Sequence, residues 1–299
     1  MKNKIISIFF CCVIIGPSIY FLPIFNLLQQ KEPVCIAVIG PMEEANGKAM
    51  RQGVELYKEQ INKQGGIDGR RIKFLFRDDQ NNADRAERIA LELAEENKVY
   101  LVLGHYYSSA SLAAGKIYKK GGIPAISASV GAESIISDNE WYIRTIPGGS
   151  IEAKLVVSYM YDILASYRNI PLAEIIKETI PASIIFTGDA DGQYLLKNFE
   201  QIAQRFGIAI KGKWQWDDEK SASEQIDNIK KELDAIDDPG VIYFATHAAE
   251  GIQIVTALKD AGKTYPMIAS AALTRSFFDK VKSYTKERET PGYYSDGMY

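Results

Sequence analysis

The 299-residue chain has few of the residues and motifs that enzymes use for chemistry. It contains two histidines, His105 and His247, and three cysteines. It lacks the G-x-S-x-G turn of hydrolases, the G-x-G-x-x-G dinucleotide fingerprint and the G-x-x-x-x-G-K-[ST] phosphate loop. Asp78 and Asp79 follow a strand-like run, where we expect them to be solvated or to cap a helix, and no complete metal-ligand spacing is present. We therefore predict no catalytic residue, metal or cofactor.

The chain also lacks a strong charge of either sign. Its 35 basic and 38 acidic residues give a formal net charge of −3. A nucleic-acid-binding protein would show a basic excess, so we predict no nucleic-acid partner. Hydrophobic residues make up 46% of the chain, which is enough for one large or two ordinary cores.

Charge is absent from one stretch near the N-terminus. After Lys2 and Lys4 no charged residue occurs before Lys31, and the apolar run 5–28 is long enough for a bilayer core of about 30 Å. No small-residue cleavage site is visible. We predict that 1–32 is an N-terminal membrane anchor whose residues 5–28 cross the cytoplasmic membrane once as a helix, with the rest of the chain on the periplasmic or extracellular side. A cleaved signal segment and a buried helix are the alternatives.

The scarcity of cysteine excludes an internal disulfide downstream of this segment. Cys11 and Cys12 lie within the apolar run, and Cys35 is alone in the remaining chain. We expect Cys35 to be a small core residue on a strand.

Strand-like and helix-like runs alternate from residue 33 to about 147. The apolar run 34–40 is typical of a strand buried on both faces, and 47–66 has helical spacing with Met50, Val54, Tyr57 and Ile61 on one face. Further strands are expected at 70–80, 99–103 and 123–129, and further helices at 82–98 and 108–122. This βαβα order predicts an open parallel sheet covered by helices.

The alternation resumes after a linking segment at 140–150, which predicts a second α/β lobe over 148–290. Its expected strands are 182–188, 208–216, 240–246 and 265–270, and its expected helices lie near 190–206, 222–236, 248–262 and 273–282. The stretch 164–181 reads as an extra helical insertion.

Polar residues gather where four of the expected strands end, at 104–111, 127–134, 187–194 and 245–251. In open α/β sheets, ligands bind beyond the carboxyl ends of the strands. Ser108 and Ser109 fall where a helix begins, which favours an anion such as a carboxylate, while Tyr106 and Tyr107 can form a wall. The alternative is that one serine only caps the helix.

Several of these runs together resemble a known family. "IAVIGPM", "INKQGGIDGR", "VLGHYYSSAS", "GIPAISAS" and "VIYFATHAAEGIQIVTALKDAG" are similar to type I periplasmic binding proteins of the branched-chain amino-acid (Leu/Ile/Val) group of ABC-transporter receptors. The resemblance covers about 34–299. It implies two doubly wound parallel-sheet α/β lobes, three crossing strands between them and a ligand cleft. The family's C-terminal part is absent, so 291–299 would begin a return crossing.

The resemblance also implies roles for individual residues. Ser108 corresponds to a serine that binds the ligand carboxylate, and Ser129 and Gly131 correspond to other contacts of the first lobe. His247 stands where the family often has an aromatic contact, and Asp191 where it often has a tyrosine.

One position departs from the family pattern. Ala271 stands where amino-acid-binding members place an acid that pairs with the ligand ammonium. Since a buried ammonium without a carboxylate is costly, either Asp189, Asp191 or Glu250 supplies the charge, or the ligand is not a simple α-amino acid. The predicted ligand contacts are Ser108, Ser109, Tyr107, Ser129, Gly131, Asp191, His247 and Glu250.

We therefore expect a non-catalytic, extracytoplasmic binding protein for a small molecule, an amino acid or an amide, in an ABC transport system. It would close on its ligand by hinge motion and deliver the ligand to a permease. The alternatives are a ligand-sensing ectodomain that acts with a partner signalling protein and, less favoured, a hydrolase.

Overall fold

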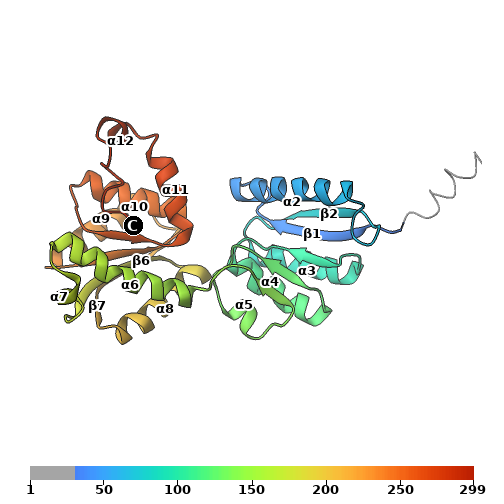
Figure 1. Ribbon diagram of the computed structural model, residues 1–299, viewed down its shortest axis with the longest axis horizontal. Coiled ribbons are helices and arrows are strands. Elements are labelled where there is room, and N and C mark those ends of the chain that lie inside the picture. Colours follow the sequence, from blue (N-terminus) through green and yellow to red (C-terminus); the bar gives the residue numbers. More distant parts are fainter. Residues whose placement is uncertain (1–30) are drawn as a thin grey trace, which may run out of the picture.

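The computed structural model describes residues 31–299, which form two α/β lobes side by side (Figure 1). Each lobe is built on one sheet in which every strand pair is parallel. The first sheet has the order β2-β1-β3-β4-β5 and the second has the order β7-β6-β8-β9. This confirms the predicted pair of parallel-sheet lobes.

The first lobe holds its sheet between helices. Its strands are β1 (Val34–Gly40), β2 (Ile72–Asp78), β3 (Leu101–Leu103), β4 (Ala125–Ser127) and β5 (Tyr142–Arg144). Its helices are α2 (Ala45–Lys63), α3 (Ala83–Glu96), α4 (Ser108–Gly121) and the short α5 (Ser134–Ser137). Helices α3 and α4 pack together on one face, where Ile89, Leu93 and Tyr118 are buried, and α2 lies on the opposite face (Figure 1).

The predicted apolar face of the 47–66 helix is only partly buried. Tyr57 is 59% exposed, and the neighbouring Leu56 is 72% exposed. Ile61 does pack against the small cluster that contains Ile36 and Ile72. Helical periodicity alone did not show how much of this face the sheet would cover.

The second lobe repeats the layered arrangement. Its strands are β6 (Ile180–Thr187), β7 (Ile208–Trp216), β8 (Val241–Ala245) and β9 (Met267–Ala269). Its helices are α6 (Gly149–Arg168), α7 (Leu172–Ile175), α8 (Ala190–Arg205), α9 (Ala222–Ala235), α10 (Ala248–Asp260), α11 (Ala271–Val281) and α12 (Thr285–Glu289). Every residue of β6 and β8 is buried, as expected for central strands of a sheet covered on both faces. The predicted insertion at 164–181 is the end of α6, the short α7 and the start of β6.

The two lobes are connected through residues 145–148, between β5 and α6. Within the described residues this is the one passage of the chain from one sheet to the other. Residues 291–299, which we expect to begin a return crossing, contact the edge of the second sheet. Met298 forms a parallel bridge with Met267, and the amide of Ala269 donates to the carbonyl of Tyr299 at 2.9 Å.

The predicted transmembrane segment 5–28 lies outside the described residues. Across 31–299, every helix is too short or too polar to span a bilayer. Cys35 is a partly buried residue of β1 with a free thiol.

Candidate ligand-binding site

A cavity of about 340 Å³ lies between the lobes at the carboxyl ends of their strands. The first lobe contributes Tyr106, Tyr107, Ser129 and Gly131 to its wall, and the connection contributes Ile146 and Pro147. The second lobe contributes the polar side chains of Glu152, Thr187, Asp191, Tyr194, Thr246, His247 and Ser270. This volume is at the lower end of the range for ligand pockets, so the cavity suits a small molecule.

The structure brings most of the predicted contact residues to this cavity. Tyr107, Ser129, Gly131, Asp191 and His247 line it directly. Ser108 is fully buried immediately behind the wall and is bonded to Asp191, whereas Ser109 and Glu250 are not among the lining residues.

A buried polar network supports the loop that carries the first-lobe contacts. His105 is fully buried. Its Nδ1 lies 2.6 Å from a carboxylate oxygen of Asp79, and its Nε2 lies 2.9 Å from the hydroxyl of Tyr118. The amide of His105 donates to the hydroxyl of Tyr142 at 3.0 Å. This arrangement corrects our expectation for Asp79, which is 0% exposed and neither solvated nor at the helix cap. Asn82 caps α3 instead.

Two further bonds tie this loop to the end of β4. The hydroxyl of Ser127 donates to the carbonyl of His105 at 2.9 Å, and that of Ser129 donates to the carbonyl of Tyr106 at 2.6 Å. Gly104 enters the loop with φ of 122°, and a Cβ there would lie 2.0 Å from the carbonyl oxygen of Ile39. Only glycine fits that position, so the first-lobe wall has a defined conformation.

The first lobe contacts the second beside the cavity through Ser108 and Tyr107, among other residues. The hydroxyl of Ser108 donates a hydrogen bond to the carboxylate of Asp191, and its amide donates to the same carboxylate at 3.4 Å. The ring of Tyr107 stands edge-on to that of His247, with 5.5 Å between centroids. The N-cap residue of α4 is Tyr107, and its side chain makes no capping bond. Ser108 is therefore not the helix cap, and its hydroxyl instead bonds to the other lobe.

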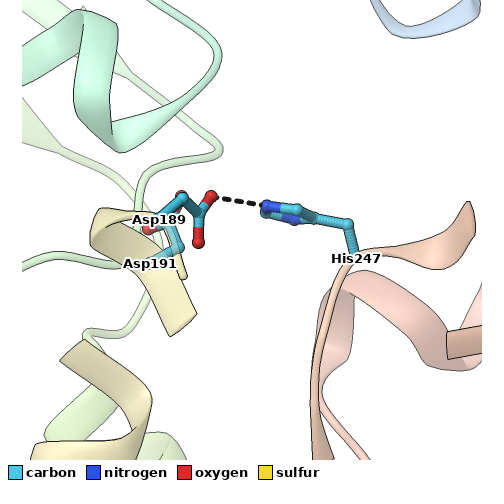
Figure 2. A group of neighbouring side chains, drawn as sticks. All are labelled: Asp189, Asp191 and His247. Carbon is cyan, nitrogen blue, oxygen red and sulfur yellow. Dashed lines mark hydrogen bonds and ion pairs between the residues drawn. The ribbon is translucent and has the colours of Figure 1, made fainter. Parts of the chain in front are cut away.

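An ion pair lies at the second-lobe side of the cavity (Figure 2). Nε2 of His247, at the start of α10, is 2.7 Å from the carboxylate of Asp189, at the start of α8. The hydroxyl of Thr187 and the amide of Gly192 also donate to Asp189, at 2.7 and 3.0 Å. β6 and β8, which precede these residues, are neighbours in the sheet, and this brings the two helix starts together.

This ion pair shifts the pKa values of both His247 and Asp189 strongly. Burial by itself would lower the pKa of His247, but the hydrogen bond and charge of Asp189 outweigh it and raise that pKa to about 9. Burial would raise the pKa of Asp189, but the bonds from His247, Thr187 and Gly192 lower it to about 2. His247 is therefore a cation and Asp189 an anion at neutral pH.

Asp189, Asp191 and His247 also form a group of possible metal ligands, with one donor atom from each within 4.8 Å of the others (Figure 2). Asp189 and His247 bind each other, and Asp191 binds Ser108. These donors therefore already have protein partners.

Glu152, on α6, is a cavity residue that the sequence analysis missed. The amide of Ala271 and the hydroxyl of Tyr243 donate to its carboxylate, each at 3.3 Å. Burial raises its pKa, those two bonds partly oppose the shift, and the charge of Asp191 adds to it. Glu152 thus supplies an acid next to Ala271, where the resemblance indicated that one was missing. The alanine at position 271 was the feature of the sequence that indicated a carboxylate from elsewhere in the chain.

Thr246 is another wall residue without a predicted role. It is 2% exposed, and its hydroxyl oxygen has no hydrogen-bond partner among the described residues. Buried hydroxyls are normally paired.

The sequence profile of the family described as Periplasmic binding protein matches residues 33–297. The chain therefore belongs to the periplasmic binding protein family, and the resemblance to its type I, branched-chain amino-acid group is confirmed.

Two curated relatives show the extent of the likeness. An "Amino acid binding protein" of Pseudomonas aeruginosa is 36% identical over 97 residues, which are 31% of this chain and 26% of that protein. A "Leu/Ile/Val-binding protein homolog 1" of Brucella abortus is 26% identical over 128 residues, which are 42% of this chain and 34% of that protein. The matched segments thus span about a quarter to a third of these relatives.

Solved structures match over more of the chain. An ABC transporter substrate-binding protein from Desulfitobacterium hafniense has a TM-score of 0.61 at 25% identity, covering 80% of this chain and 66% of that one. The branched-chain amino acid transporter substrate-binding protein of Streptococcus pneumoniae, in complex with isoleucine, has a TM-score of 0.68 at 19% identity. It covers 86% of this chain and 68% of that one, and it shows the shared fold.

Proposed function

We propose that this chain is an extracytoplasmic binding protein for a small, amino-acid-like molecule in an ABC transport system, and that its lobes close on the ligand by hinge motion. The observation that carries the proposal is the cavity, because both lobes contribute polar side chains to it. A ligand that contacts both lobes binds the closed form more tightly and shifts the population toward it.

The family and the printed names of the relatives support this assignment. The matched profile is that of periplasmic binding proteins, the curated relatives are named as amino-acid and Leu/Ile/Val-binding proteins, and the solved structures include transporter substrate-binding proteins. In this proposal, residues 5–28 hold the chain at the outer face of the membrane, and a permease receives the ligand.

A thermal-shift screen tests the proposal, using amino acids, their amides, simple amines, urea and short carboxylates. We expect at least one of these compounds to raise the melting temperature. Gly131→Leu should abolish the shift because Gly131 lines the cavity and its Cβ would already lie 3.7 Å from Asp191.

Gly53→Leu is the matched control. A Cβ at Gly53 meets no atom within 4 Å, and Gly53 lies on α2, so this variant should respond like the wild type. A screen without a stabilising compound, or an unchanged response from Gly131→Leu, would show that the cavity is not the binding site.

A further inference from the structure

The donors of Ser108, where we expect a ligand carboxylate to bind, are already bonded to a side chain of the second lobe. Exposed N–H groups and a hydroxyl at a helix start favour a carboxylate. In this chain the hydroxyl and amide of Ser108 both donate to Asp191. A ligand carboxylate at this place would have to displace Asp191 or lie against it, and like charges in a partly buried site repel strongly.

The remaining charge in the cavity is negative. The cation His247 is neutralised by Asp189, which leaves Glu152 and Asp191 as acids of the wall. Among the side chains that the structure describes, neither acid makes a salt bridge to a Lys, Arg or His residue. Burial raises the pKa of both carboxyl groups, and the charge of Asp191 raises the pKa of Glu152 further. Buried carboxylates without a cation are costly, so a cationic ligand would stabilise them.

The aromatic residues of the wall suit the same ligand. Tyr106, Tyr107 and Tyr194 all line the cavity, and a tyrosine ring attracts a cation that approaches its face. The partly buried Asp191 retains acceptor capacity, since a carboxylate has about four acceptor sites and Ser108 supplies two donors.

From these contacts we propose that the cavity is specific for a small ligand that carries a cationic amine and no carboxylate, with the amine held by Glu152 and Asp191. This inference rests on the proposed function and names the ligand class of the same site. Asp191 takes the place that a ligand carboxylate would otherwise fill, and Glu152 supplies the charge that Ala271 does not.

The test is calorimetric titration of the full chain with leucine and three compounds that share its isobutyl group. Leucine carries both charges, leucinamide and 3-methylbutylamine carry the amine only, and 4-methylpentanoate carries the carboxylate only. We expect the two amine compounds to bind at least about tenfold more tightly than leucine, and 4-methylpentanoate to give no binding heat, because each lost or repelled charged contact changes affinity by about ten- to a hundredfold.

Two variants connect this preference to the named acids. Glu152→Gln keeps the shape of the side chain and should weaken amine binding by about ten- to a hundredfold. Asp191→Ala releases the donors of Ser108 and should shift the leucine-to-amine affinity ratio toward leucine by at least about tenfold. Glu174→Gln is the matched control, because Glu174 is an exposed residue of α7 in the second lobe, outside the cavity wall, and its replacement should leave amine affinity unchanged.

Tighter binding of leucine or 4-methylpentanoate by the wild type would overturn the inference and leave the proposed function intact. Failure of all four compounds would overturn both the inference and the amino-acid-like part of the proposed function. Amine binding that Glu152→Gln and Asp191→Ala leave unchanged would also overturn the inference, because the amine would then be held elsewhere.

Discussion

Replacing Asp79 by alanine should destabilise the first lobe without affecting the second. The carboxylate of Asp79 lies 2.6 Å from Nδ1 of His105 and also accepts the amide of Asn81 at 3.0 Å. Asn81 lies at the surface, where water replaces the lost bond, but His105 is 0% exposed and has no access to water. Breaking a buried pair by removing one partner costs about 3–5 kcal/mol, and we expect a loss in this range.

Hydrogen–deuterium exchange resolved by peptide is the suitable assay because it reports on each lobe separately. Amides of β1 and β3, which belong to the lobe of Asp79, should exchange more than about a hundredfold faster in Asp79→Ala, whereas those of β6 and β8 should not change. Asp84→Ala is the control. Asp84 is an exposed residue in the first turn of α3, where a carboxylate contributes about 0.3–1 kcal/mol. A change of less than about 1 kcal/mol for Asp79→Ala, or equal changes in both lobes, would refute the reasoning.

Two further predictions concern the second lobe. The pKa of His247 is raised from 6.5 to about 9 in the folded protein, so the stabilisation by its charged form is complete below about pH 6.5 and is lost as the pH rises through 9. The free energy of unfolding of the wild type in urea should therefore exceed that of His247→Gln at pH 6, and this difference should disappear by pH 9. A difference that stays constant over this range would contradict the prediction. A Cβ at Gly192 would lie 2.2 Å from the carbonyl oxygen of Thr187, so Gly192→Ala should lower the free energy of unfolding by at least about 1–3 kcal/mol in thermal unfolding. Gly53→Ala is the control and should be neutral or stabilising, because a Cβ at this helical position lies in open space. Equal melting temperatures of the two variants would count against the close approach at Gly192.

Much of the fold could be predicted because its sequence signals are local. The central strands β1 and β8 are continuous apolar runs, and the helices between them have clear spacing and end signals, so the parallel α/β order follows from the pattern. The exposure of Tyr57 did not follow from it. Helical periodicity identifies an apolar face, but the tertiary arrangement decides how much of that face is covered.

The candidate site was predictable to the extent that it lies at strand ends. Tyr107, Ser129 and His247 follow β3, β4 and β8, and all three line the cavity. Glu152 was missed because it reaches the cavity from the first turn of the long helix α6, away from any strand end. Its proximity to Ala271, which is 119 residues away in sequence, depends on how α6 packs on the second sheet.

Asp79 shows a different limit. An acid after a strand is usually solvated or a cap, and nothing in the neighbouring residues indicates otherwise. Its partner His105 is 26 residues away, and only the pairing of β1 with both β2 and β3 brings the ends of these strands together. Buried polar pairs of this kind depend on strand order, which the sequence pattern does not specify.

Small-angle X-ray scattering with and without a compound that passes the thermal-shift screen tests most directly whether the lobes close on a ligand in the cavity. The account predicts that a saturating compound reduces the radius of gyration of the wild type and leaves that of Gly131→Leu unchanged. In the proposed function the ligand contacts both lobes and therefore favours a closed form, and both lobes contribute residues to the cavity wall. Tight binding with no change in the scattering of the wild type, or the same change in both proteins, would contradict it.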